Sequence, residues 1–135
     1  MLIRRFRAAD EAAVIELWRR CGLVVAANDP ARDIARKLAY QPELFFVGTI
    51  DDRVVATVMA GYEGHRGWIN YLAVSPDRQR AGLGRRMMAH AERALQGLGC
   101  PKINLQVRAT NTAVVEFYER RGFAVEDRVS MGKRL

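Results

Sequence analysis

The sequence has few of the residues that would place it in several familiar classes of protein. Its 135 residues include two cysteines, Cys21 and Cys100, so we expect neither a disulfide framework nor a metal site. No apolar run approaches the length of a membrane span, and the apolar stretch at the N-terminus is too short for a signal peptide. No linker, repeat or low-complexity segment interrupts the chain. We therefore expect a single domain over residues 1–135 in the reducing cytoplasm, without a membrane partner.

The charged residues are unbalanced but dispersed. Lysine and arginine total 22 against 15 acidic residues, which gives a net charge of +7. Such an excess would attract an anionic cofactor, a nucleic acid or an acidic protein, or would serve only solubility. A nucleic-acid-binding domain would need its cations on one face or interleaved with aromatic residues, and neither pattern is evident. Nucleic-acid binding is therefore kept only as an alternative.

The N-terminal part predicts one strand and two helices. Leu2 to Arg7 is short and apolar, as in a strand, and Asp10 is expected to cap the helix that follows. Asp29 is expected to cap a second helix, because Pro30 suits the first helical position, and Gln41 with the proline after it ends that helix. The buried stripe of the first helix has the spacing i, i+3, i+4, i+7 and comprises Val14, Leu17, Trp18 and Cys21.

The rest of the chain predicts a mixed sheet. Residues 44–50 and 54–60 are two strands whose connection is so short that they must pair antiparallel, and a glycine-rich turn leads to a third strand at 68–74. A crossover helix then places residues 102–107 parallel to that strand. We predict a last helix from Asn111 to Arg121 and a weak strand at 128–135. The fold class is α/β, with a mostly antiparallel sheet, two central parallel strands and helices on both faces.

The most informative stretch is a glycine-containing turn between a strand and a helix, Gln79-Arg80-Ala81-Gly82-Leu83-Gly84. The first amides of a helix have no partner within the helix, and glycine lets the backbone approach an anion closely. A P-loop would need a Lys-Ser or Lys-Thr pair, which the sequence lacks. A dinucleotide fingerprint would need a third glycine where Met87 stands, so a hydride-transfer enzyme is disfavoured. The turn therefore predicts a phosphate or diphosphate site of another kind.

The pattern Q-x-x-G-x-G after a strand that ends in Leu-Ala-Val resembles the acyl-CoA signature of the GNAT superfamily of N-acetyltransferases. A second block, from Asn111 to Phe123, resembles the family's N-x-x-A/V-x-x-F-Y-x-x-x-G-F block residue by residue. The resemblance covers nearly the whole chain and is closest to the small bacterial YpeA-type members. It implies the GNAT fold, in which two parallel central strands splay apart around the pantetheine arm of the cofactor.

The resemblance also implies a set of acetyl-CoA-binding residues. The strand Leu72 to Val74 would pair its backbone with the pantetheine amides and could polarise the thioester carbonyl. Asn111 matches the position that hydrogen-bonds the cofactor, although it could equally be a plain helix cap. The diphosphate would lie on the turn, and the complete set is Leu72, Ala73, Val74, Gln79, Arg80, Ala81, Gly82, Leu83, Gly84, Arg85, Asn111 and Tyr118.

Tyr118 matches the family's tyrosine near the cofactor sulfur, and we assign it as the catalytic acid. A phenol with a pKa near ~10 is a reasonable donor to a thiolate whose acid has a pKa near ~8.5. The general base stays open, because neither central strand carries a carboxylate. Glu63, His65 and a water chain past Asn70 and Tyr71 are the candidates. The acceptor pocket is expected to form from residues 23–28, the second helix and the 62–68 turn.

These residues predict direct transfer of an acetyl group from acetyl-CoA to a primary amine of a small molecule or of a protein or peptide N-terminus. The missing strand carboxylate favours an alternative, a regulatory module of the same fold that binds CoA without turnover. Nothing in the sequence selects one amine, and the absence of an acidic cluster mildly disfavours a cationic acceptor. A C-terminal strand could pair with a second copy of the chain, so a homodimer stays open.

Overall fold

A computed structural model describes all residues from Met1 to Leu135 as two compact units, each of which is described by itself. The first unit, Met1–Leu105, holds the sheet and three α-helices, and the second, Gln106–Leu135, holds one α-helix. The elements of the first unit are β1 (Leu2–Arg5), α1 (Glu11–Arg20), α2 (Pro30–Ala39), β2 (Phe45–Ile50), β3 (Arg53–Tyr62), β4 (Gly67–Val74), α3 (Leu83–Gly97) and β5 (Ile103–Asn104). The helix of the second unit is α4 (Thr112–Arg120).

The sheet has the order β1-β2-β3-β4-β5, with every neighbouring pair antiparallel except β4 and β5. The turn between β2 and β3 is made by Asp51 and Asp52, both with left-handed φ, which is the backbone that a tight hairpin requires. The crossover through α3 makes β5 parallel to β4, as predicted. The α/β class and the mixed, mostly antiparallel sheet are therefore confirmed.

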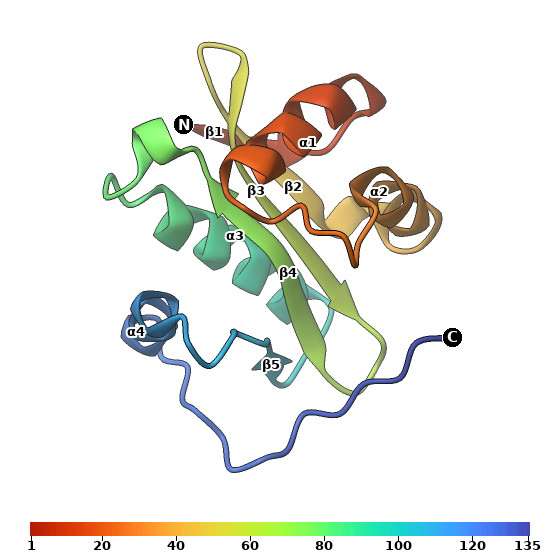
Figure 1. Cartoon of the computed structure of the whole chain (residues 1–135), viewed down its shortest axis with the longest axis vertical. Coiled ribbons are helices and arrows are strands. Elements are labelled where there is room, and N and C mark those ends of the chain that lie inside the picture. The colour runs from red at the N-terminus through yellow and green to blue at the C-terminus, as the bar shows by residue number, and fades with distance from the viewer. The chain divides into compact units, whose positions relative to one another are not determined.

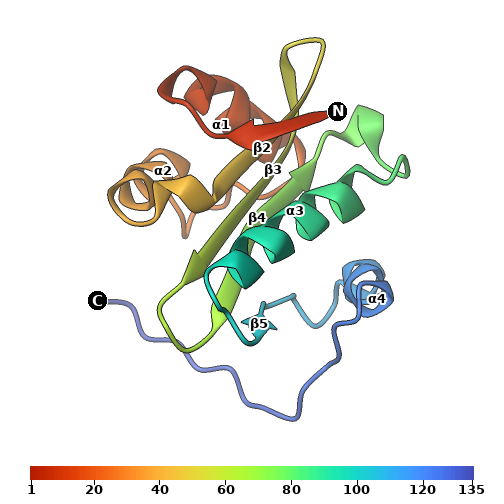
Figure 2. The same ribbon diagram turned by 180° about the vertical axis from the view of Figure 1, so that it is seen from behind.

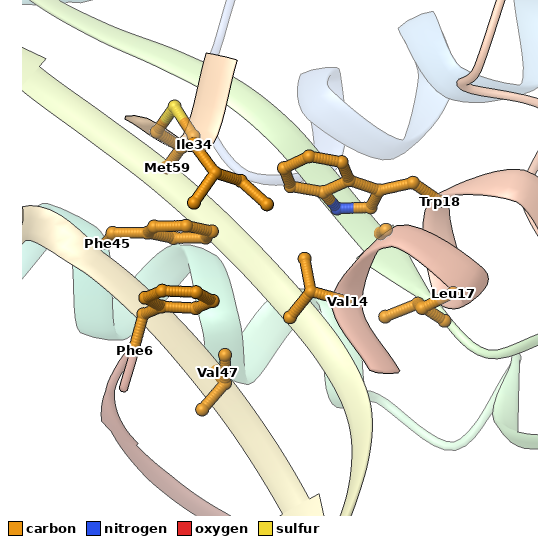
Figure 3. Packing of buried hydrophobic residues seen from close by; sticks show 9 residues of the cluster. Phe6, Val14, Leu17, Trp18, Ile34, Phe45, Val47 and Met59 are labelled. Atoms are coloured by element: carbon orange, nitrogen blue, oxygen red, sulfur yellow. The ribbon is translucent and has the colours of Figure 1, made fainter. Parts of the chain in front are cut away.

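Helices cover both faces of the sheet, as predicted (Figures 1 and 2). The two faces follow from the alternation of side chains along each strand. On the face under α1 and α2, Phe6 and Phe45 stack with ring centroids 4.5 Å apart, and Trp18 and Ile34 close the core from above (Figure 3). On the opposite face, Phe46 contacts the His90 ring of α3 edge-on at 4.5 Å. Each face thus has its own apolar layer. None of the helices combines the length with the apolar composition that a membrane-spanning helix requires.

Two of the expected helix caps have different outcomes. The Asp29 carboxylate accepts a hydrogen bond from the Arg32 amide at 3.2 Å, so this cap is confirmed. Asp10 precedes α1 but makes no capping bond to it, which corrects that prediction. Its carboxylate instead accepts two hydrogen bonds from the Arg4 guanidinium, at 2.8 and 2.9 Å, and one from the Arg7 amide. The Arg4 guanidinium donates two charge-assisted hydrogen bonds, which are stronger than a bond from an unpaired backbone amide at the start of the helix.

The strands expected after α3 are shorter than predicted or absent. Only Ile103 and Asn104 pair with β4, so β5 is the outermost strand of the sheet. Residues 123–135 form no strand, so the structure lacks the C-terminal strand through which a homodimer could have paired. The apolar residues of this tail do alternate, but no neighbouring strand pairs with the tail and little of its apolar surface is buried, so the pattern alone does not form a strand. Val125, Val129, Met131 and Leu135 are all more than three-quarters exposed.

Candidate active site

The glycine turn opens α3 with a row of unpaired backbone amides. Gly82 is the residue before the helix and has a left-handed φ of 79°, and Arg80 is left-handed as well, with φ 66°. The amides from Arg80 to Arg85 donate no hydrogen bond to the backbone, and the ladder begins where the Arg86 amide donates to the Gly82 carbonyl at 3.2 Å. Left-handed residues next to a helix start turn consecutive N–H groups toward one side. The turn therefore offers a concave row of donors to an anion.

The charges around the turn favour the same ligand. The first turn of α3 has no acidic residue, although carboxylates are the side chains that the positive end of a helix normally attracts. Arg80 and Arg85 are exposed there, whereas Asp77 is already paired with Arg20 at 2.9 Å. A Cβ built on Gly82 would meet only the Arg85 Nη2 atom, at 3.8 Å, so the space above the amides is open. An anion bound there would complement the helix dipole and both arginines.

The strand that leads to this turn is irregular in its middle. Tyr71 has a left-handed φ of 50°, and the register between β3 and β4 shifts opposite it, which is a β-bulge. Buried Thr57 of β3 holds the bulge, because its hydroxyl donates to the Tyr71 carbonyl at 2.8 Å and accepts from Trp18 Nε1 at 2.9 Å. The alternation of β3 shows that Thr57 faces the helix α1, but no sequence signal marked the bulge. Thr57 and Trp18 were missed as site residues for that reason.

Beyond Trp68, β4 pairs only with β3, so its other edge has no strand partner along the predicted residues Leu72 to Val74. Backbone groups on such an edge can pair with an extended amide-containing ligand. The Val74 carbonyl accepts from the Gln79 side chain at 3.2 Å, which ties the end of the strand to the start of the glycine turn. The structure therefore brings the predicted strand and the predicted turn together into one continuous surface.

The Tyr71 side chain carries a polar network that the sequence analysis did not foresee. Its ring stacks on Trp18 with centroids 3.8 Å apart. Its hydroxyl donates to Asp33 Oδ2 of α2 and accepts from Asn28 Nδ2, both at 2.6 Å. Burial and the bond to Asp33 raise the pKa of Tyr71 to about 12, so the phenol stays protonated at neutral pH. A carboxylate is therefore held at the bulge from a helix rather than from a strand.

A cavity of about 430 Å³ lies beside this network. The second helix lines it as predicted, but neither residues 23–28 nor the 62–68 turn does, and this corrects the expected pocket. Asn28 is connected to the cavity only through its hydrogen bond to the Tyr71 hydroxyl. The turn does not line it because the Gln41 side chain holds Tyr62, accepting from its amide at 2.9 Å and donating to its carbonyl at 2.7 Å. The lining residues are Asp33, Arg36, Lys37, Tyr40, Met59, Asn70 and Tyr71.

The two candidate bases on the hairpin turn lie apart from this cavity. The Glu63 carboxylate accepts hydrogen bonds from the His65 and Arg66 amides and so closes the turn between β3 and β4. Both Glu63 and His65 are exposed. They precede Gly67, and a strand rises about 3.3 Å per residue, so the bulge at Tyr71 lies at least roughly 13 Å further along β4.

The second unit contains the other two predicted residues. Asn111 precedes α4, but its side chain makes no capping hydrogen bond and is exposed, which argues against the plain helix cap. Tyr118 is buried between the rings of Phe117 and Phe123, at 5.1 and 5.5 Å, and burial raises its pKa to about 12. Gly122 ends the helix with a left-handed φ of 92°, and the Phe123 amide donates to the Tyr118 carbonyl, as the sequence predicts for this block.

Known proteins resemble this chain in sequence and in fold. A family model described as acetyltransferase (GNAT) family matches residues 10–123. The acetyltransferase ECA0875 of Pectobacterium atrosepticum is 45% identical over 135 residues, which cover 100% of this chain and 96% of that protein. Among solved structures, the PaiA N-acetyltransferase of Thermoplasma acidophilum with coenzyme A has a TM-score of 0.82 at 18% identity, over 95% of this chain and 92% of the other. The ribosomal-protein-S18-alanine N-acetyltransferase of Escherichia coli has a TM-score of 0.73 at 26% identity, over 90% and 76%.

Proposed function

The chain belongs to the GNAT family of acetyltransferases, and from this membership we propose that it transfers an acetyl group from acetyl-CoA directly to the primary amine of an acceptor. Small-molecule amines and protein or peptide N-termini are the acceptor classes. We further propose that residues 1–135 act as one domain, that the chain is a YpeA-type member, and that it works in the cytoplasm. Both cysteines are free thiols, which suits a reducing compartment.

The observation that carries this proposal is the row of unpaired amides from Arg80 to Arg85 at the start of α3. The diphosphate of acetyl-CoA fits that row, because the helix dipole, Arg80 and Arg85 all favour negative charge at the same place. Gln79, Ala81, Gly82, Leu83 and Gly84 complete the turn around it. Asn111 is proposed as a hydrogen-bond donor to the cofactor, since its amide is not engaged as a cap.

The bulged strand is proposed to position the thioester. Backbone groups of Leu72, Ala73 and Val74 would pair with the pantetheine amides along the unpartnered edge of β4. An N–H group that the bulge turns away from the β3 ladder would polarise the thioester carbonyl and stabilise the oxyanion of the tetrahedral intermediate. Thr57 and Trp18 fix that backbone, so they act as positioning residues.

Tyr118 is proposed as the donor to the departing thiolate. Its raised pKa keeps the hydroxyl protonated throughout the neutral range. That pKa also exceeds the ~8.5 of an ordinary thiol, so complete proton transfer would be uphill and the hydroxyl instead donates a hydrogen bond while the C–S bond breaks. The thiolate then takes its proton from solvent.

The competing proposal, a CoA-binding module without turnover, depended on the lack of a carboxylate on the central strands. The Asp33 carboxylate at the bulge weakens that argument, because it brings a proton acceptor to the cavity beside β4. Two measurements test binding and turnover in turn, and only the second separates the proposals. Saturation with acetyl-CoA at about 100 times its Kd should stabilise the fold by about 2.7 kcal/mol, or roughly 9 °C in Tm for a chain of this size. Release of free thiol with an amine panel then distinguishes an enzyme from a module.

A further inference from the structure

Two opposite charges on one face of α2 flank the cavity without pairing with each other. Asp33 and Lys37 are four residues apart, a spacing at which an acidic and a basic side chain usually form an ion pair. No such pair forms here. Asp33 accepts from the Tyr71 hydroxyl at 2.6 Å, and the Lys37 Nζ atom donates to the Ala60 carbonyl of β3. The protein thus holds a negative and a positive group apart at the wall of the cavity.

Each of the two groups keeps capacity for a ligand. Asp33 is the only carboxylate that lines the cavity, and its side chain is 28% exposed. Its other oxygen accepts a hydrogen bond from the Arg36 guanidinium at 3.3 Å, an exposed ion pair that is weak enough to exchange for the charged groups of a ligand. Lys37 is half-buried and pairs with no carboxylate. One of its three N–H groups donates to the Ala60 carbonyl, which leaves two for a ligand. Burial lowers the pKa of Lys37, and the more distant charge of Glu43 only partly opposes that effect. The Lys37 ammonium is partly removed from water and has no counter-ion, so an anionic group of a ligand would stabilise it.

We propose that the cavity binds the acceptor as a zwitterion, with the amine at the Asp33 carboxylate and an anionic group at Lys37 and Arg36. This inference rests on the proposed N-acetyltransferase activity and names its substrate class, amines that also carry a carboxylate or similar anion. Met59 and the rings of Tyr40 and Tyr71 would contact an apolar side chain. About 430 Å³ accommodates a molecule of amino-acid size.

The same site accounts for the proton that the reaction releases. The acceptor arrives as an ammonium ion, whose proton passes to the Asp33 carboxylate and on to solvent. The nitrogen lone pair then forms the new N–C bond at the thioester carbonyl, whose π electrons move to the oxygen. The nitrogen of this tetrahedral intermediate loses a second proton through the Asp33 carboxylate to solvent, and the C–S bond breaks to leave the acetylated product and CoA thiolate. Tyr71 does not react, because it donates to Asp33 and so orients the carboxylate.

The test compares matched probes with and without the anion. L-Methionine and L-phenylalanine are compared with their C-terminal amides, and the dipeptide methionyl-alanine separates free amino acids from peptide N-termini. Thiol release from acetyl-CoA measures turnover. Binding is followed separately in a Trp68→Phe background, where Trp18 is the only tryptophan and reports on the cavity through its stacking with Tyr71. CoA is present throughout, and its own binding is measured first.

The variants remove one charge at a time. Lys37→Met keeps the aliphatic stem, and its matched control is Arg32→Met on the same helix but outside the cavity. Asp33→Asn keeps an oxygen that can accept from Tyr71, and its control is Asp29→Asn, which preserves a good helix cap. Loss of one charged hydrogen bond predicts roughly a 10- to 100-fold effect on kcat/KM.

We expect the free amino acids to bind and react at least about tenfold better than their amides, and Lys37→Met to abolish this difference by weakening only the acids. Asp33→Asn should lower kcat for both series, most strongly at low pH, where more of the acceptor is protonated. The proposal is overturned if the amides react equally well, if Lys37→Met leaves the preference unchanged, or if no probe perturbs Trp18 while CoA binds. Failure to bind CoA or acetyl-CoA would instead overturn the proposed function itself.

Discussion

Replacing Gly82 separates the electrostatic role of the glycine turn from its conformational role. Gly82 has a φ of 79°, so any L-residue there is strained by roughly 1–2 kcal/mol, yet an added Cβ meets only Arg85 Nη2, at 3.8 Å. Gly82→Ala therefore introduces the strain alone, and Gly82→Glu introduces the same strain together with a negative charge. Both variants should lose a similar few degrees of Tm, because the turn is on the surface.

Their affinities for CoA should differ far more than their stabilities. A carboxylate about 4 Å from one phosphate charge repels it by about 1 kcal/mol in water and about 4 kcal/mol at the effective dielectric of a protein surface. The Glu variant should consequently bind CoA roughly 5- to 1,000-fold more weakly than the Ala variant, and the gap should narrow as salt is added. Titration calorimetry of both variants at low and high ionic strength measures this. Equal affinities for the two variants would refute the placement of the diphosphate on this turn.

Three further predictions test the bulge, the thiolate donor and the partly buried ion pair of Arg4 and Asp10. Thr57→Val removes both the donor to the Tyr71 carbonyl and the acceptor of Trp18 Nε1, so it should lower the unfolding free energy by about 1–3 kcal/mol and reduce kcat; an unchanged urea midpoint would contradict the role of Thr57. Tyr118→Phe should lower kcat about 10- to 100-fold with little change in CoA affinity, and wild-type kcat should show no tyrosine ionisation below pH 10, because burial raises the pKa of Tyr118 to about 12. Asp10→Asn should destabilise the fold at neutral pH, because the hydrogen bond from Arg4 lowers the pKa of Asp10 in the folded protein. The stability that the Asp10 carboxylate contributes is fully present above the unfolded pKa of ~3.9 and is lost as the pH falls through the lower folded pKa. Urea titrations of the two proteins should therefore converge in strong acid.

The fold could be predicted from the sequence wherever a local pattern of residues determines the structure. The apolar spacing of Val14, Leu17 and Trp18 gave the buried face of α1, and the short turn at Asp51 and Asp52 required an antiparallel pair. Asp10 shows where local reasoning ends, because its partner Arg4 comes from β1 and not from the helix that it precedes. The tail after Phe123 has the alternating apolar residues that predicted a weak strand, but it buries too little of their surface to form one.

The candidate site divides in the same way. The glycine turn is local in sequence, so its backbone conformation could be anticipated from the motif, whereas its binding of a diphosphate stays a prediction. The bulge at Tyr71 depends on Thr57 of β3 and Trp18 of α1. The placement of the Asp33 carboxylate depends on its contact with Tyr71, 38 residues further along the chain. A search for the base near the central strands therefore ended at Glu63 and His65 of the turn and at a water chain past Asn70 and Tyr71. Only the three-dimensional arrangement brings a helix carboxylate to the bulge.

The most direct test of the central claim is to compare CoA with pantetheine, which keeps the amide-containing arm but lacks the diphosphate, by titration calorimetry at low salt. If the unpaired amides from Arg80 to Arg85 bind the diphosphate, CoA should produce a saturable heat and bind at least about 100-fold more tightly than pantetheine. Equal affinity for the two compounds, or no heat with CoA at all, would contradict the claim.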